Sequence, residues 1–317
     1  DDANQAFDAL VNAFSDDYGD DQTSAYLERM AQVTGRWGEL INSANAWLQD
    51  EEDPRKLIQL GLRLGKWYGE DLGRPEYAMP YYQKVLEMDP QNTRVMRQMA
   101  AIDRLAGNYQ KAGAILNRAL EVAVVNEDRK AILVDLGDIL YRNLDQVDQA
   151  TPYYKRALEV DPNYLPALSA LERIYEDKGQ TQELVDVLTR KVTGIEDAAQ
   201  GIKERLRLAE LLEKDLRDAQ GAAAIYRQVL EIDSGNLPGL RGLERVDEML
   251  QDWPDLVEVL QLQLEVVETE RERVEVLLKL AALQEEQFLK ADVAAQHLEK
   301  ALEIAPGEER AYVALER

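Results

Sequence analysis

The sequence repeats the same residues at intervals of 72, and this interval limits the possible folds more than any other feature. A helix end with the pattern Leu-Glu-x-x-Pro begins at Leu86, Leu158 and Leu302, and again at Leu230 with Ser234 in place of the proline. Positions upstream keep the same interval, namely Leu64, Leu136, Leu208 and Leu280; Ala78, Ala150, Ala222 and Ala294; and Tyr82, Tyr154, Tyr226 and Leu298. So regular a repeat predicts one supersecondary unit stacked on its own copies, which is a solenoid.

A second pattern lies about half an interval away from the first. It consists of Gly35, Gly107 and Gly179, with Gln251 at the fourth place. Two residues later come Trp37, Tyr109, Thr181 and Trp253. A glycine between two stretches of helical periodicity predicts the end of one helix, a tight turn and the start of the next. Each 72-residue copy is therefore predicted to hold two helical hairpins, and copies 1 to 4 begin at residues 1, 73, 145 and 217.

The residues of the hairpin over 57–90 resemble the tetratricopeptide repeat family. They are Leu64-Gly65, Tyr68, Gly73, Ala78, Tyr82, Val85 and Pro90, and the next copy repeats them as Leu136-Gly137, Asp145, Ala150, Tyr154, Ala157 and Pro162. The resemblance covers the whole chain and implies an all-α fold, a right-handed α-solenoid superhelix of stacked antiparallel helical hairpins. The sequence departs from the family pattern in two ways, since the first helix of these hairpins has one extra residue and the alternate hairpins lack the final proline.

The pattern can be followed to both ends of the sequence. Residues Ala6 to Phe14 match Ala78 to Leu86, and the final Leu315-Glu316-Arg317 matches Leu243-Glu244-Arg245. Residues 1–317 are therefore predicted to form a single solenoid with eight complete hairpins and half a hairpin at each end. A solenoid in solution needs polar caps at its ends, so we expect this sequence to be a fragment of a longer array.

The composition argues against several classes of function. The 61 acidic residues outnumber the 37 basic ones, giving a net charge of −24, so nucleic-acid binding is not expected. Without a run of 18 uncharged apolar residues, membrane insertion is not expected either. The sequence has no cysteine and one histidine, His297, at a predicted packing position. We therefore expect neither an enzyme, a metal site nor a cofactor; cytoplasm and periplasm both fit this composition.

The acidic excess is uneven, because copy 2 is close to neutral while the other copies are acidic. Within copy 2, Arg94, Arg97 and Arg104 are spaced by three and seven residues, which places them on one face of a predicted helix. Such a face could receive the carboxylates of an acidic peptide or the end of a partner helix. The alternative is that these arginines form an ordinary solvated face.

Other candidate contact residues recur in the motif Leu-Glu-Arg. By resemblance to the family, its arginines would face the concave groove as a ladder, made of Arg29, Arg173, Arg245 and Arg317. Alternatively, each arginine pairs with a glutamate of an adjacent repeat. Trp67 is a further candidate, because only one of the adjacent Trp67 and Tyr68 is expected to face the core.

These observations favour a non-enzymatic scaffold that binds a segment or helix of another protein in the concave groove, with residues 73–144 as the attachment point. The partner is expected to be a protein or peptide, and an acidic segment is one candidate. A second hypothesis is a structural spacer within a large bacterial envelope or motility assembly, which the regular double repeat resembles.

Overall fold

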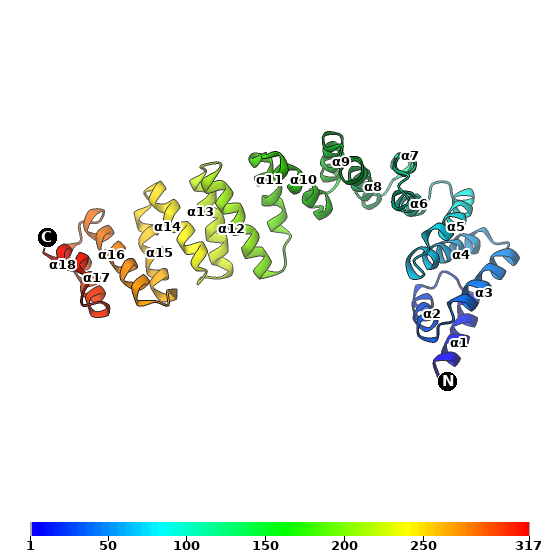
Figure 1. Cartoon of the computed structure of the whole chain (residues 1–317), viewed down its shortest axis with the longest axis horizontal. Coiled ribbons are helices and arrows are strands. Elements are labelled where there is room, and N and C mark those ends of the chain that lie inside the picture. The colour runs from blue at the N-terminus through cyan, green and yellow to red at the C-terminus, as the bar shows by residue number, and fades with distance from the viewer. Residues whose placement is uncertain (1, 317) are drawn as a thin grey trace. The chain divides into compact units, whose positions relative to one another are not determined.

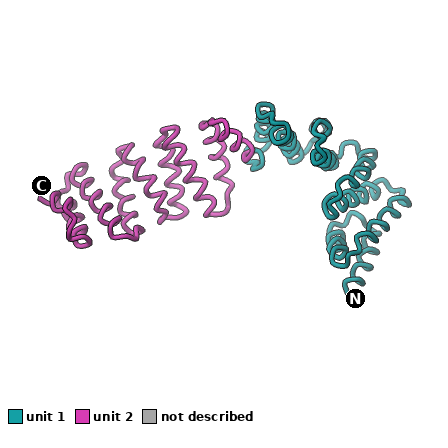
Figure 2. The backbone as a smooth tube through the Cα atoms, in the orientation of Figure 1, with its two compact units in different colours: residues 1–167 teal, residues 168–317 magenta. Residues whose placement is uncertain are grey.

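A computed structural model describes residues 2–316. The chain divides into two compact units, unit 1 with residues 1–167 and unit 2 with residues 168–317 (Figure 2). Each unit is described by itself below. The continuous solenoid over residues 1–317 and its right-handed superhelix stay predictions.

Unit 1 is built from consecutive helices that pack on one another (Figure 1). Two of its helices run into short π-helical turns, η1 (Trp67–Asp71) and η2 (Ile139–Asn143). Its α-helices are α1 (Asp2–Asp16), α2 (Asp21–Thr34), α3 (Trp37–Asp50), α4 (Pro54–Lys66), α5 (Pro75–Met88), α6 (Thr93–Leu105), α7 (Tyr109–Val122), α8 (Asn126–Asp138) and α9 (Val147–Val160).

Unit 2 has the same kind of architecture, and α10 (Leu165–Lys178) contains the boundary between the units. Its remaining helices are α11 (Thr181–Thr193), α12 (Ala198–Lys214), α13 (Ala219–Ile232), α14 (Leu237–Leu250), α15 (Trp253–Val266), α16 (Glu270–Glu286), α17 (Ala291–Ile304) and α18 (Glu309–Leu315). Residues 2–316 thus form 18 α-helices and no strand. The predicted all-α solenoid of helical hairpins is confirmed. None of these helices is both long enough and apolar enough to cross a bilayer.

The turns between helices follow the same interval as the sequence. The left-handed backbone conformation, with φ near +60°, occurs at two series of positions in residues 2–316. They are Gly35, Gly107, Gly179 and Gln251, and Gly73, Asp145, Arg217 and Leu289. The first series is the one that the sequence predicted as turns. A side chain with a Cβ is strained in this conformation, so the repeat imposes the turn even where the residue is unsuited to it.

The extra residue in the first helix of each tetratricopeptide-like hairpin is accommodated in two ways. In copies 1 and 2 the helix ends in a π turn, η1 or η2, in which the N–H of Leu72 donates to the carbonyl of Trp67 at 2.9 Å. In copies 3 and 4, α12 and α16 continue as α-helix for 17 residues each. The π turn widens the helix by one residue per turn, and it therefore changes which side chains face the core.

The residues that define the repeat form the core. All twelve of the repeated leucine, alanine and tyrosine-type positions, from Leu64 to Leu298, are buried. Burying a leucine stabilises the fold by roughly 2 kcal/mol, and small residues opposite large ones allow neighbouring helices to approach closely. The sequence interval therefore reports the packing of each hairpin.

Candidate partner-binding site

A hollow of about 450 Å³ lies between α6 and α8 in unit 1, and we call it the α6–α8 hollow. Its lining residues are Arg94, Arg97, Gln98, Ala100, Ala101 and Arg104 from α6, Leu116 from α7, Asp128 and Asp135 from α8, and Ile139 from η2. The structure thus brings the three arginines selected from the sequence to one place. The hollow combines an apolar floor with a charged rim, which is the usual composition of a binding site.

The three arginines differ in their partners. Arg97 donates from Nε to Oδ2 of Asp135 at 2.7 Å, and Nη1 of Arg104 lies 4.0 Å from Oδ2 of Asp138. Arg94 is exposed and makes no ion pair within residues 2–316. Because its charge is not neutralised by a neighbouring carboxylate, Arg94 is the cation of the hollow best placed to bind an external anion.

The floor of the hollow differs from that of the equivalent hollow in copy 4. Ala100 and Ala101 stand where copies 1, 3 and 4 have the Glu-Arg of the Leu-Glu-Arg motif. Ala100 is buried at the floor of the hollow, and Ala101 lies beside it. The equivalent hollow between α14 and α16 has a similar volume of about 430 Å³ and is lined by Glu244 and Arg245. The alanine pair therefore makes the floor apolar where copy 4 has two charged side chains.

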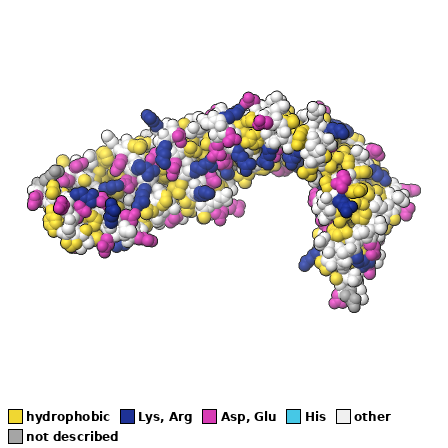
Figure 3. Space-filling model, viewed as in Figure 1, with side chains coloured by type: hydrophobic (Ala, Val, Ile, Leu, Met, Phe, Trp, Pro, Cys, Tyr) yellow, Lys and Arg dark blue, Asp and Glu magenta, His cyan; other side chains and the backbone are white. Residues whose placement is uncertain are grey.

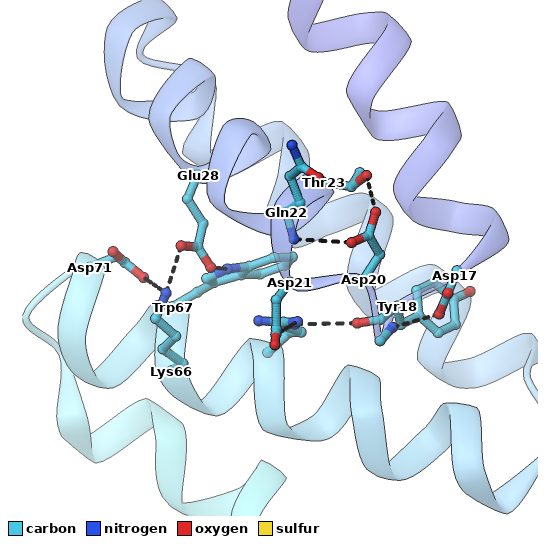
Figure 4. Close-up of polar contacts among 12 residues, drawn as sticks. Asp17, Tyr18, Asp20, Asp21, Gln22, Thr23, Glu28, Lys66, Trp67 and Asp71 are labelled. Atoms are coloured by element: carbon cyan, nitrogen blue, oxygen red, sulfur yellow. Dashed lines mark hydrogen bonds and ion pairs between the residues drawn. The ribbon is translucent and has the colours of Figure 1, made fainter.

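In the other copies this glutamate holds adjacent helices together. Glu28 accepts from Lys66 Nζ at 2.6 Å and from the indole Nε1 of Trp67 at 2.8 Å (Figure 4). Glu172 in unit 2 accepts from Arg207 Nη1 at 2.6 Å and from Lys191 Nζ at 2.8 Å. Burial alone would raise the pKa of the Glu172 carboxyl, but hydrogen bonds from these two cations lower it.

Glu244 occupies the same place in copy 4. It pairs with Lys279 of α16 and accepts from Nε2 of Gln263 at 2.7 Å. Across unit 2, Lys and Arg side chains lie beside Asp and Glu side chains, as Figure 3 shows. Most of these charges are therefore neutralised by a neighbouring side chain of opposite sign.

In copy 2, the first helix α6 and the second helix α8 carry charges opposite to those at the same places in other copies. The place of Asp135 is held in the other copies by a cation, namely Arg63, Arg207 and Lys279. Arg104, in turn, stands where copies 3 and 4 have Glu176 and Glu248. In copies 1 and 3 an acidic first helix faces a basic second helix, whereas in copy 2 the basic helix α6 faces the acidic helix α8. This exchange places the cations at the hollow.

Family models described as tetratricopeptide repeat match residues 62–92, 92–163 and 167–200. These parts of the chain belong to the tetratricopeptide repeat family. Proteins of this family generally mediate protein–protein interactions. The α6–α8 hollow lies inside the longest of the three matches, so it is formed by ordinary repeats of the family and not by an insertion.

Solved structures similar to this tetratricopeptide repeat protein include one from a characterisation of Pseudomonas aeruginosa pilF. It is 17% identical, with 76% of this chain and 98% of that chain covered and a TM-score of 0.45. Naa15/Naa10 bound to HypK-THB is 18% identical, with 83% and 38% covered and a TM-score of 0.49. Yeast Tom70 is 14% identical, with 94% and 62% covered and a TM-score of 0.38. The curated proteins contain no match to the sequence.

The arginines of the predicted ladder have different surroundings in the tetratricopeptide array. Arg245 donates from Nε to Oε1 of Glu213 at 2.7 Å, and the Tyr226 hydroxyl donates to the same carboxylate at 2.7 Å. Arg245 thus has the pairing that the structural alternative describes. Arg29 and Arg173 are exposed and make no ion pair in the described part of the chain, while Arg317 lies outside the described residues.

The expectation that Trp67 faces outward is wrong. Its side chain is 0% exposed, and its ring lies 5.4 Å from that of Phe14 and 6.2 Å from that of Trp37, between ring centroids. Its N–H is satisfied by Glu28, as described above. The physical reason is that Trp67 continues the buried face of α4 after Leu60 and Leu64, because its N–H still makes the α-helical hydrogen bond to the carbonyl of Arg63. Trp67 stabilises unit 1 and is not available to a partner.

Some residues of the site were not selected from the sequence. They are Asp135 and Asp138, which bind the arginines, and Ala100 and Ala101, which belong to the floor of the hollow. A signal was present for three of them, because Asp135, Ala100 and Ala101 differ in charge from the same places in copies 1 and 3, whereas the place of Asp138 is also acidic in copy 3, as Glu210. A comparison that looks for differences among copies would have found the site.

Proposed function

We propose that this tetratricopeptide repeat protein is a non-enzymatic scaffold, and that the α6–α8 hollow binds an acidic segment of another protein. The observation that carries the proposal is the exposed guanidinium of Arg94, which makes no ion pair in residues 2–316, on the rim of a hollow whose floor includes the alanine pair of copy 2. Arg97 and Arg104 lie on the same helix face and add positive potential.

The chemistry of the hollow fits such a segment. Arginine presents several N–H donors in a planar group and binds carboxylates at two points. A carboxylate that reached Arg94 would meet a charge with no competing ion pair in residues 2–316. The floor of Ala100, Leu116 and Ile139 would receive an apolar side chain of the same segment.

Charge complementarity also limits where the segment can bind. In unit 2 the hollow of about 430 Å³ between α14 and α16 is lined by both acids and bases. Arg245, Arg241 and Lys279 of that hollow already pair with carboxylates. Arg271 of that hollow makes no ion pair in residues 2–316, but an acidic segment would also meet the carboxylates of the lining residues Glu248 and Glu275, which makes the second hollow the weaker site.

The experiment compares single charge reversals with a matched control. Ten-residue peptides that carry two adjacent glutamates in a Gly/Ser background would be tested by fluorescence anisotropy. Arg94→Glu should abolish measurable binding, whereas Arg173→Glu, which reverses an equally exposed and unpaired arginine in unit 2, should leave binding within about two-fold of wild type.

Two results would refute the proposal. One is equal binding by the wild type and by Arg94→Glu, and the other is equal loss with Arg173→Glu, which would indicate a general charge effect. Binding should also weaken as salt is raised from 50 to 300 mM, because the contact is electrostatic. A spacer, in contrast, would keep its natural interactions when all three arginines of α6 are reversed.

A further inference from the structure

Two exposed valines lie in the connection between α7 and α8. The side chain of Val124 is 90% exposed and that of Val125 is 57% exposed. Single apolar residues on a surface are common, but two adjacent valines at a position where the other copies are polar require an explanation.

Copies 1, 3 and 4 have Glu52-Asp53, Glu196-Asp197 and Glu268-Thr269 at this position. The second residue of each pair caps the following helix. Asp53 accepts from the N–H of Arg55 at 2.9 Å, Asp197 from Gln200 at 2.7 Å, and Thr269 from Glu272 at 3.2 Å. Val125 occupies the same capping position before α8 and offers no acceptor.

Copy 2 has therefore given up a helix cap, and the loss of such a cap typically lowers stability several-fold to about ten-fold in the folding equilibrium. Nothing in the fold compensates for it, because both valines point into solvent and not into the core. A helix cap that is lost without a compensating contact indicates that the residues at that place serve a function and not stability.

The valine pair directly precedes a helix that lines the α6–α8 hollow. The hydroxyl of Thr93, the first residue of α6, donates to Oδ2 of Asp128 at 2.7 Å, which joins the first turns of α6 and α8. Asp128 lines the hollow together with Arg94. The carbonyl of Val125 accepts from the N–H of Arg129 in the first turn of α8 at 3.1 Å. Val125 is therefore one helical turn before a residue that lines the hollow.

We propose that the partner is an extended acidic segment that also carries a large apolar side chain, and that this side chain packs on Val124 and Val125 while a neighbouring carboxylate binds Arg94. The proposal rests on the function proposed above and adds the chemistry and register of the partner. Val125 and Asp128 are one helical turn apart, about 5 Å, and Asp128 lines the hollow together with Arg94. In an extended segment, which rises about 3.3 Å per residue, the apolar residue should therefore lie within a few residues of the carboxylate.

Charge and contact area both bear on which partner fits this surface. Arg94 makes no ion pair in residues 2–316 and shares the hollow with Asp128, one turn after Val125, which favours a partner with a carboxylate close to its apolar residue. A second copy of this chain fits less well, because two valine side chains are far smaller than the roughly 800 Å² per partner of a stable dimer.

The test uses the fluorescent peptides described above, each with the two glutamates fixed and a single leucine moved one position at a time. With the wild type, one or two leucine positions should raise affinity by about five-fold over the peptide without leucine, as expected for partial burial of an apolar side chain. In the double variant Val124→Ser with Val125→Ser, this gain should vanish while binding of the glutamate-only peptide stays unchanged.

Serine is chosen because it is neutral and restores a capping acceptor at position 125. The double variant should therefore melt at a higher temperature than the wild type, so a loss of the leucine effect cannot come from unfolding. Val33→Ser removes a 63% exposed valine near the end of α2 and should leave the leucine effect intact.

The outcomes separate this inference from the proposed function. If Arg94→Glu abolishes binding but leucine has no effect in the wild type, the proposed function stands and the inference is wrong. If the serine variant keeps the five-fold gain, the inference is also wrong. Dissociation of a wild-type dimer by the same variant in analytical ultracentrifugation would assign the valines to self-association and overturn it.

Discussion

The ring of Tyr154 lies directly against the backbone of Gly137. A Cβ added to this glycine would come within 2.7 Å of the ring atom Cε1. Tyr154 is buried in α9, and its hydroxyl donates to Oδ1 of Asp138 at 2.8 Å, so the ring is held at both ends. The close approach of α8 and α9 therefore depends on the absence of a side chain at residue 137.

This contact predicts opposite effects for two Gly→Ala changes in neighbouring helices. Gly137→Ala should destabilise unit 1 by about 1–3 kcal/mol, because the ring or the helix must shift. Gly113→Ala in α7 meets no atom within 4 Å and should stabilise by about 0.5–1 kcal/mol through helix propensity. Urea denaturation measures both changes, and a stabilising Gly137→Ala would contradict the packing described.

Leu289 is strained in a way that a single substitution relieves. Its φ is 53° and its side chain is 87% exposed, so it has a left-handed backbone without compensating burial. Leu289→Gly should raise the free energy of unfolding by about 1 kcal/mol. The reciprocal change, Gly73→Leu at the equivalent turn with φ 62°, should lower it by a similar amount in chemical denaturation.

Asp247 gives unit 2 a dependence on pH. Its side chain is 0% exposed, and neither carboxylate oxygen has a hydrogen-bond partner in residues 2–316. Burial, followed by the charge of Asp255, raises the pKa of Asp247 to about 7. The nearby Asp252 also raises this pKa, whereas Arg227 at 3.7 Å lowers it. The unfolded pKa is lower, so the folded state binds the extra proton between these two values.

The sign of the effect follows from this difference. The stabilisation from protonated Asp247 is complete near pH 4 and is lost as pH rises through about 7. Asp247→Asn should therefore stabilise the protein at pH 8, by about 2 kcal/mol, and have little effect at pH 4.5. The control is Asp103→Asn at the equivalent position of copy 2, where the carboxylate accepts from Asn108 Nδ2 at 3.1 Å. An equal gain in that control would exclude the explanation.

Arg94 and Arg97 should separate binding from stability. Arg97→Ala leaves Asp135 without its ion pair and should cost about 0.5–1 kcal/mol in thermal or urea unfolding, as for a partly exposed pair. Arg94→Ala breaks no ion pair in residues 2–316 and should change stability by less than about 0.5 kcal/mol. A large loss of stability with Arg94→Ala would show a structural role and weaken its use as a binding residue.

The repeat interval made the helix and turn positions predictable, because the same packing recurs in each copy. Even Gln251, which has no turn propensity of glycine, was placed correctly at its left-handed turn by position alone. The burial of Trp67 agrees with the helical period, because Trp67 lies three residues after Leu64 and seven after Leu60 on the same buried face. The choice between Trp67 and Tyr68 needed that comparison.

The arginines of α6 were visible from their spacing, but the hollow beside them was not. Ala100 and Ala101 are ordinary residues for a helix, and their effect on the lining of the hollow appears only in comparison with Glu172, whose carboxylate pairs with Arg207 and Lys191. Likewise, the reversed charge at Asp135 is seen only when this residue is compared with Arg63, Arg207 and Lys279 at the same place in the other copies.

The exchanged order of charges between α6 and α8 also bears on how the array avoids folding into the wrong arrangement. Similar repeats can exchange hairpins with one another during folding, either within one chain or between chains. If α12 took the place of α8 beside α6, Arg207 would stand where Asp135 stands and would face Arg97. Repulsion between like charges would penalise that arrangement. Arg97 and Asp135, which line the proposed partner site, thus also favour the pairing of α6 with α8 over its pairing with α12.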